Sequence, residues 1–172
     1  MQIFTRDSSK TALDERFHRL LSIEGSALLR LAGSYTRSSS DRDDLFQDIV
    51  LAIWGALPSF RAESSERTFI FRIAHNRAIR FSSQRQPPTT SAEEIEMSDP
   101  RPSPERGLAT EQQETRLLEA IRQLPINYRQ VITLTLEDLS YAEIAQILGI
   151  NENNVGVRLN RARQLLRRLL EA

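Results

Sequence analysis

The sequence predicts an all-α protein of two small helical domains, joined by a Pro-rich linker, with a helix-turn-helix in the C-terminal domain. Apolar residues recur at helical spacing through most of the chain, and no segment alternates apolar and polar residues as a half-buried strand does. Five of the seven prolines fall between residues 83 and 107. Since 40% of the 172 residues are hydrophobic, each side of this segment can form a packed core.

The N-terminal domain is predicted to begin with two helices. Residues 1–11 are polar and predict a flexible tail. A first helix is expected from Ala12 and a second after a break near Gly25, and both are amphipathic. The positions expected to face the core are Leu13, Phe17, Leu20, Leu21, Leu28, Leu31, Ala32 and Tyr35.

Two further helices complete the predicted N-terminal domain. One covers 42–55, with Ser40 or Asp41 as its N-cap, and Pro58 follows its end. The other covers 67–82. Their expected inward positions are Leu45, Ile49, Ala52, Ile53, Ile70, Ile73, Ala74, Ala78 and Phe81.

The segment 84–110 is predicted to be a linker. It is rich in Pro, Ser and Thr, and residues 93–99 contain four acids and no base. Such a composition buries little apolar surface and favours extended, semi-rigid chain. We therefore expect one domain over 12–83 and another over 111–172.

The C-terminal domain is predicted to hold two supporting helices, over 110–124 and 127–136, and then a helical hairpin. Ser140 can cap the first hairpin helix and Glu143 can complete a capping box with it. Gly149 can end that helix with a positive φ. Asn151 can cap the second hairpin helix.

The second hairpin helix is apolar on one side and rich in Arg and Asn on the other. Its predicted buried stripe is Val155, Leu159, Ala162, Leu166 and Leu169. A Gly-containing turn before such a helix is what a helix-turn-helix that reads the major groove requires. An ordinary helical hairpin with a solvated polar face fits the same pattern. The predicted outer face is Asn153, Val157, Asn160, Arg161, Gln164, Arg167 and Arg168, with Gly156 at its margin.

Composition excludes several other classes of function. The chain has no cysteine, so disulfides and thiolate metal sites are excluded, and two histidines make a metal or His-based catalytic site improbable. No run approaches the length of a membrane span, and the first ten residues lack the apolar core of a signal peptide. We expect a cytoplasmic protein without cofactor or enzymatic activity. The formal net charge is zero, but residues 158–168 hold five Arg and no acid, which suits a nucleic-acid partner.

Two separated segments resemble one family, the group IV or extracytoplasmic-function (ECF) sigma factors of bacterial RNA polymerase. Residues 44–54, DLFQDIVLAIW, resemble the family's D-L-x-Q-E-x-F-x-x-x-W helix, and residues 67–76, RTFIFRIAHN, resemble its T-W-L-x-x-I-A-x-N helix. The second segment comprises Leu124-Pro125 with Tyr128-Arg129, then LSYAEIA at 139–145 and VGVRLNRAR at 155–163. The resemblance implies a promoter-melting region 2, a flexible linker and a helix-turn-helix region 4.

The resemblance implies two contacts with core RNA polymerase. Region 2 would bind the clamp of the largest polymerase subunit, and region 4 would bind the flap of the second-largest subunit. Asp44 can also be read as an acid that stabilises the positive end of its own helix. The residues assigned to the clamp are Asp44, Leu45, Gln47 and Asp48.

The resemblance also implies two contacts with promoter DNA. The loop 59–67 would accept an extruded base of the minus-ten element, although Phe69 can instead be read as a core residue. The minus-ten residues are Phe60, Arg61, Phe69, Arg72, Asn76 and Arg80. The minus-thirty-five residues are Asn153, Gly156, Val157, Arg158, Asn160 and Arg161.

This sequence departs from the family pattern at several of these positions. Phe69 replaces the usual Trp and Asp48 the usual Glu, and both changes preserve the chemistry. Gly156 and Val157 stand where many members have a basic and a hydroxyl residue. Because neither side chain donates a hydrogen bond, base reading is expected to depend on Asn160, Arg161 and apolar contact with thymine methyl groups.

These observations favour a sigma factor that binds core polymerase and promoter DNA, and they leave open whether an anti-sigma factor is a further partner. Two other readings remain open. A transcriptional repressor or activator could use the same helix-turn-helix without joining polymerase. A helical interaction scaffold, or an anti-sigma protein, would bind no DNA at any salt concentration.

Overall fold

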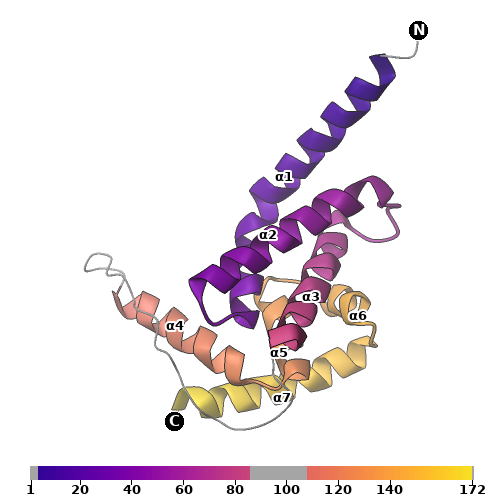
Figure 1. Cartoon of the computed structure of the whole chain (residues 1–172). Helices are drawn as coiled ribbons and strands as arrows, with labels where there is room; N and C mark the ends of the chain where they lie inside the picture. The colour runs from indigo at the N-terminus through magenta and orange to yellow at the C-terminus, as the bar shows by residue number, and fades with distance from the viewer. Residues whose placement is uncertain (1–3, 86–107, 172) are drawn as a thin grey trace.

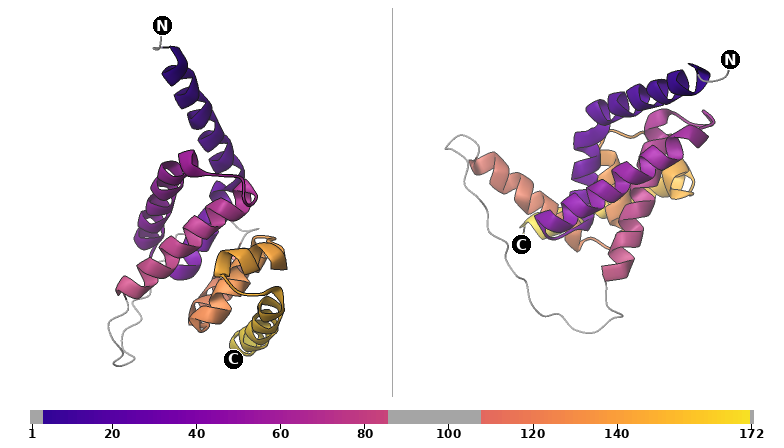
Figure 2. Two further views of the ribbon diagram at one scale, coloured as in Figure 1. Left: turned by 90° about the vertical axis from the view of Figure 1, so that its right-hand side faces the viewer. Right: turned by 45° about the horizontal axis from the view of Figure 1, so that its top comes forward.

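The computed structural model describes residues 4–85 and 108–171, and every regular element in these ranges is helical. Helices α1 to α3 form one unit and α4 to α7 a second, with α3 and α6 lying side by side (Figures 1 and 2). The all-α prediction is therefore confirmed. No helix in the described ranges has the length and apolar character to cross a membrane. The elements are α1 (Phe4–Tyr35), α2 (Ser39–Ala56), the 3-10 turn η1 (Leu57–Ser59), α3 (Glu66–Arg85), α4 (Leu108–Gln123), α5 (Ile126–Leu136), α6 (Tyr141–Leu148) and α7 (Glu152–Glu171).

The prediction of a helix break near Gly25 is wrong, and the first helix begins at Phe4, within the segment predicted as a tail. A single helix of 32 residues, about 48 Å long, starts at Phe4 and passes through Gly25. A glycine inside a helix costs only about 1 kcal/mol relative to alanine. Burial offsets that cost here, because residues on both sides of Gly25 face the core on one stripe. That stripe is Leu20, Glu24, Leu28, Leu31 and Tyr35.

The predicted N-cap of α2 is also wrong. Ser38 is the cap, with an extended backbone (φ −107°, ψ 157°), and its Oγ accepts the Asp41 N–H. Asp41 therefore lies in the first turn, whereas Asp44 lies farther along the helix. Because the helix dipole acts within the first turn, it does not explain the acid at position 44.

The ends of the predicted linker belong to helices. Residues 84–85 continue α3 and residues 108–110 begin α4. The remaining predicted linker residues, 86–107, lie outside the described residues. Pro125 separates α4 from α5 as expected.

The helix-turn-helix has the caps that the sequence predicted. Ser140 Oγ accepts the Glu143 N–H, and the Glu143 carboxylate accepts the Ser140 N–H at 2.9 Å, which completes the capping box. Gly149 has φ 66°, in the left-handed region. Asn151 Oδ1 accepts the Asn154 N–H at 2.8 Å at the start of α7.

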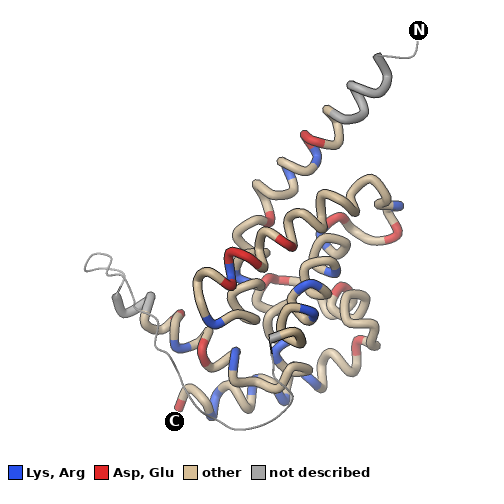
Figure 3. The backbone as a smooth tube through the Cα atoms, viewed as in Figure 1, with Lys and Arg blue, Asp and Glu red and all other residues tan. Residues whose placement is uncertain are grey.

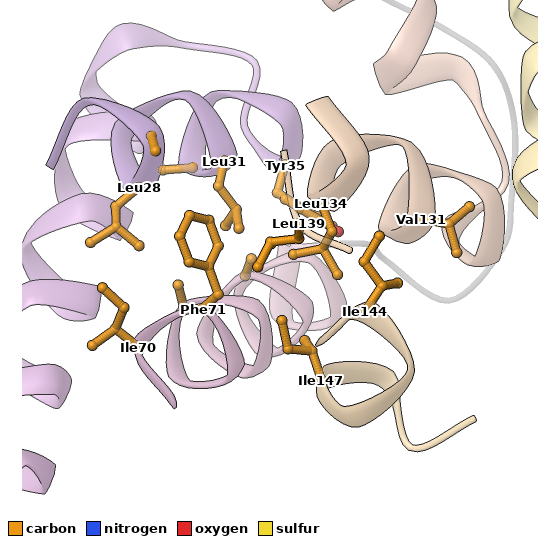
Figure 4. Close-up of a cluster of buried hydrophobic side chains, with 14 of the residues drawn as sticks. Leu28, Leu31, Tyr35, Ile70, Phe71, Val131, Leu134, Leu139, Ile144 and Ile147 are labelled. Carbon is orange, nitrogen blue, oxygen red and sulfur yellow. The ribbon is translucent and has the colours of Figure 1, made fainter. Parts of the chain in front are cut away.

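One hydrophobic cluster runs through both helical units. Phe71 of α3 is fully buried and lies between α1 residues on one side and the helix-turn-helix on the other (Figure 4). Ile144 and Ile147 of α6 extend this cluster toward α5. The two units therefore share apolar surface in this arrangement. The side chains labelled in the close-up are Leu28, Leu31, Tyr35, Ile70, Phe71, Val131, Leu134, Leu139, Ile144 and Ile147.

Most inward positions predicted in the N-terminal unit are buried, and the exceptions lie at the rim of the cluster. Ala52 is half-buried, and Ile73 and Phe81 are partly buried. Leu13 and Phe17 pack against the same cluster from the exposed half of α1.

The turn between α5 and α6 is tied to the N-terminal unit by ionic contacts. The Glu137 carboxylate is only 5% exposed and accepts two hydrogen bonds from the Arg30 guanidinium, at 2.6 and 3.0 Å. Arg67 donates to the Glu137 carbonyl oxygen at 2.5 Å and pairs with Glu24 of α1. The Glu137 hydrogen bond raises the pKa of Arg30.

Two further contacts cross between the units. Thr68 Oγ1 donates to a Glu143 carboxylate oxygen at 3.3 Å, so the start of α3 meets the capping box of α6. Arg122 of α4 donates to the Gly33 carbonyl oxygen near the end of α1 at 3.0 and 3.1 Å. Burial lowers the pKa of Arg122, with Arg37 among the cations nearby.

We predict that Gly25→Ala raises the free energy of unfolding by about 0.5 to 1 kcal/mol, because an added Cβ meets no atom within 4 Å in a continuous helix. Urea unfolding followed by circular dichroism measures this. Gly149→Ala is the matched control and should lower stability, because its φ of 66° strains any L side chain. Destabilisation by Gly25→Ala would favour a break in α1.

We predict that His75 makes the protein less stable in acid. Burial lowers the pKa of His75 to about 4, compared with about 6.5 in an unfolded chain. Between these pH values the unfolded chain binds a proton that the folded protein does not, so the free energy of unfolding decreases as the pH falls.

Urea unfolding at pH 7.5 and pH 5, compared with the same pair of measurements on His75→Gln, isolates this contribution. The loss should be greater in the wild-type protein by about 2 kcal/mol. Equal losses in the two proteins would show that carboxylates and not His75 cause the acid sensitivity.

Candidate nucleic-acid interface

The second helix of the helix-turn-helix presents a polar face to solvent. Val155, Leu159 and Ala162 are buried and fix the rotation of α7 about its axis. Asn160 and Arg161 are consequently exposed on the opposite side. The residues of the predicted outer face, all exposed, are Asn153, Val157, Asn160, Arg161, Gln164, Arg167 and Arg168.

Two predicted minus-thirty-five residues lie at the edge of this face. Gly156 is half-buried beside α6, and an added Cβ would lie 3.5 Å from the Tyr141 ring. Arg158 is also half-buried, on the flank between the outer face and the core. Tyr141 was not among the residues predicted to lie at this face, although it is 42% exposed and borders the face next to Gly156. A large residue at the first position of the first hairpin helix was the available signal.

The capping box also sets the charge at the start of α6. The Ser140 backbone N–H lowers the pKa of Glu143, and the Ser140 and Thr68 hydroxyls and the Arg67 charge act in the same direction. Glu143 therefore remains an anion and an acceptor at neutral pH. The first hairpin helix, α6, packs against α7, whose first residues, Glu152, Asn153 and Asn154, are exposed.

The structure brings two predicted minus-ten aromatics together. The Phe60 and Phe69 ring centroids lie 4.9 Å apart, and both rings are partly exposed. Phe69 also packs against the rim of the hydrophobic cluster, so the core reading and the surface reading of this residue are both partly correct. Arg61 is exposed in the loop between η1 and α3. Ala62 follows it with φ 58°.

The remaining minus-ten residues extend along α3 from these rings. Arg72 is half-buried, whereas Asn76 and Arg80 are exposed. Together with Phe69 they form a polar side of α3 that is distinct from the side contacting α6. This surface combines aromatic rings with cations, a combination suited to unpaired bases and their phosphates.

An exposed stripe of α2 carries the predicted polymerase contacts. Asp44, Gln47 and Asp48 are exposed and recur at helical spacing. The prediction of Leu45 as a polymerase contact is wrong, because its side chain is fully buried in the core, where helical spacing had also placed it. Leu51 was missed. It is 69% exposed, one turn beyond Asp48 on the same stripe, and its spacing from Asp44 was a readable signal.

Acids outnumber Arg on α2, whereas Arg outnumbers acids on α3 and α7. Acids mark the backbone of α2, and Arg residues mark α3 and α7 (Figure 3). Asp48 and Arg77 form an exposed pair at 3.3 Å, the kind of surface ion pair that contributes little to stability. Within the described ranges no group of three or more His, Cys, Asp or Glu residues is placed to hold a metal ion.

Family models match both helical units. The sigma-70 region 2 model covers residues 20–87, and the sigma-70 region 4 model covers residues 114–166. The chain is also 30% identical to the RNA polymerase sigma factor NccH of Alcaligenes xylosoxydans xylosoxydans, over 91% of this chain and 87% of NccH. This chain belongs to the ECF sigma factors of the sigma-70 family.

Other sigma factors show similar identity to this chain over most of its length. Identity is 31% with the sigma factor CnrH of Cupriavidus metallidurans, again covering 91% of this chain and 87% of the relative. It is 32% with the ECF sigma-E factor of Escherichia coli strain K12, covering 74% of this chain and 73% of that protein. The sigma factor thus belongs to a family of transcription initiation factors and not of enzymes.

Solved structures show the same fold. The structure of CnrH in complex with the cytosolic domain of CnrY aligns with a TM-score of 0.70 and 28% identity, covering 92% of this chain and 89% of that chain. The sigma factor RpoE of Bartonella quintana, in complex with the anti-sigma factor NepR, aligns with a TM-score of 0.65 at 21% identity over 92% of this chain and 98% of that chain.

Proposed function

We propose that this sigma factor directs core RNA polymerase to promoters through three separate surfaces. The stripe on α2 binds the largest-subunit clamp, the loop and polar side of α3 hold the melted minus-ten strand, and the outer face of α7 reads the minus-thirty-five element. Region 4 also binds the flap of the second-largest subunit. In this division region 2 covers 12–83, the linker 84–110 and region 4 111–172.

One observation carries the proposal. The three surfaces lie on different helices and consist mostly of exposed or half-buried residues, while the contacts between the two units use other residues, such as Arg30, Thr68 and Glu137. Family membership explains why one chain needs all three. A repressor or activator would have no use for an exposed Asp44 stripe on a helix that does not contact DNA.

At the minus-thirty-five element, side chains of α7 supply the hydrogen bonds to bases. Asn160 can pair with adenine through two hydrogen bonds, and Arg161 with guanine. Val157 is 43% exposed and offers an apolar contact for a thymine methyl group. Phosphate contacts from Arg167 and Arg168 add affinity without specificity.

At the minus-ten element, capture of an unpaired base must offset the cost of unstacking it, which is a few kcal/mol. Stacking on an aromatic ring contributes about 1 to 3 kcal/mol per base. Phe60 and Phe69 supply the rings. Arg61 and Arg80 supply cations for the strand's phosphates.

The two units must separate to bind both elements at once. The elements lie about 25 base pairs apart, or roughly 85 Å along the duplex, whereas α3 and α6 are in contact here. The 22 residues from 86 to 107 can span at most about 75 Å, and the units themselves cover the rest. Polymerase binding therefore has to break the Glu137 and Glu143 contacts.

An anti-sigma factor is proposed as a further partner, because the relative CnrH was solved in complex with the cytosolic domain of CnrY, and RpoE of Bartonella quintana with the anti-sigma factor NepR. We place the protein in the cytoplasm, where polymerase and promoter DNA occur.

The transcription test of the proposed function uses reconstituted holoenzyme. Promoters are selected from a randomised DNA library and then assayed for run-off transcription.

Selected DNA that the holoenzyme binds but does not transcribe would contradict the proposal. Affinity purification from the native host separates the alternatives. Core polymerase should co-purify with a sigma factor but not with a repressor or activator that works alone.

We predict that Asp48→Arg weakens binding to core polymerase at least tenfold, because it reverses the charge at the centre of the α2 stripe. The fold should persist, since the Asp48–Arg77 pair is exposed. Surface plasmon resonance measures the affinity. Glu114→Arg, the same charge change at an exposed residue of α4, is the control and should bind like wild type. Equal losses in both variants would indicate a nonspecific charge effect.

We predict that Arg161→Ala weakens holoenzyme binding to the selected promoter by about 1 to 3 kcal/mol and relaxes selection at one base of the minus-thirty-five element. Electrophoretic mobility shifts with the four single-base variants measure both effects. Arg163→Ala removes an exposed Arg from the flank of α7 and should leave base selection intact. Uniform weakening across all bases would assign Arg161 to a phosphate.

A further inference from the structure

Two consecutive residues of α1 contact the elements that flank the loop 61–65. Phe17 packs against Trp54 near the end of α2, with ring centroids 4.9 Å apart. Arg16 places its guanidinium carbon 4.9 Å from the centroid of Phe60, which directly precedes the loop. Phe60 is therefore in contact with both Arg16 and Phe69.

The same guanidinium reaches the other end of the loop. Arg16 Nε donates to Glu66 Oε1 at 2.6 Å, and Glu66 is the first residue of α3. The two side chains are 29% and 32% exposed, so water screens the pair less than a fully exposed one. A single side chain of α1 thus fastens both ends of the loop.

The hydrogen bonds within this segment also gather near its ends. The Phe60 N–H donates to the Leu57 carbonyl oxygen at 3.2 Å, and Ser65 Oγ accepts the Thr68 N–H at 3.0 Å. Between them lies exposed Arg61, followed by Ala62 at φ 58°. Fixing the ends of a short loop restricts the conformations available to its middle.

We propose that Arg16 is a positioning residue for base capture, which orders the loop 61–65 and the Phe60 ring so that they receive an unpaired base of the melted DNA strand. The inference rests on the proposed function of this loop. Ordering the loop before DNA arrives removes a conformational cost that binding would otherwise carry. It also assigns a role in DNA melting to the N-terminal half of α1.

The planar guanidinium of Arg16 is suited to contact the Phe60 ring and the Glu66 carboxylate at the same time. It can lie over the Phe60 ring while its edge donates to the Glu66 carboxylate. Lysine in its place would keep a cation near Glu66 but lose the flat stacking surface. The opposite role, in which Arg16 covers the ring face that the base needs, predicts faster melting once Arg16 is removed.

The first experiment uses the free, full-length protein and needs no promoter. Hydrogen–deuterium exchange of the peptide covering residues 60–66 should be about tenfold faster in Arg16→Ala than in wild type. Arg19→Ala is the matched control. Arg19 pairs with the same carboxylate at 3.2 Å but is 59% exposed and has no ring contact in the described structure.

The second experiment uses holoenzyme and fork-junction DNA built from a selected promoter, with each of the four bases in turn at the first unpaired position. Arg16→Ala should lower discrimination among the four bases about tenfold and slow strand opening, followed by 2-aminopurine fluorescence, by a similar factor. Arg16→Lys should recover only part of the loss. Binding to core polymerase should not change, which separates loop positioning from general misfolding.

Unchanged exchange in the loop of Arg16→Ala overturns the proposal whether or not a promoter is found. Faster opening by the variant would instead establish the covering role. If wild-type holoenzyme opens no selected DNA, the proposed function fails, and the exchange result alone then decides whether Arg16 orders the loop.

Discussion

The ionic contact between the buried Glu137 carboxylate and Arg30 is the interaction that organises the two helical units of this sigma factor. A carboxylate that is 5% exposed needs compensating donors, because burying an unpaired charge is costly. Arg30 of α1 supplies two of them, and Arg67 of α3 holds the carbonyl of the same residue. The α5–α6 turn is therefore positioned from the N-terminal unit.

This arrangement brings the two proposed DNA-binding sites into contact through the start of α3. Thr68 bonds to the capping box of α6 one residue before Phe69, whose ring borders the melting loop. Phe71 continues the contact as apolar packing against α6 (Figure 4). The residues that join the units are consequently neighbours of the residues that would receive a melted base. Any partner that separates the units also changes the environment of that loop, and the free energy of separation subtracts from the partner's binding energy.

The sequence correctly predicted the helix caps of the helix-turn-helix, which depend on residues close together in the chain. Ser140, Glu143, Gly149 and Asn151 act through hydrogen bonds and backbone angles within one turn of their own helix, and all four lie as predicted. Gly25 was misread because tertiary burial on both sides outweighed its weak helix propensity. The N-cap of α2 was misread because three consecutive serines can each cap this helix, and Ser38 is the one with the extended backbone. Leu45 was assigned to the core by helical spacing and to the clamp by the family motif, and only the core assignment is correct, while Leu51 lies on the exposed stripe.

The sequence by itself determined the helical fold class and the helix-turn-helix, because helical spacing and capping depend on residues only a few positions apart, and its motifs resembled those of the family. Periodicity also predicted the faces of α3 and α7 that carry the candidate DNA contacts. Only the tertiary structure decided how the two units pack and which side chains of one helix serve another. Arg16 with Glu66, Arg30 with Glu137 and Thr68 with Glu143 join residues 50, 107 and 75 positions apart. No local pattern encodes such pairs, since they exist only once the helices have packed.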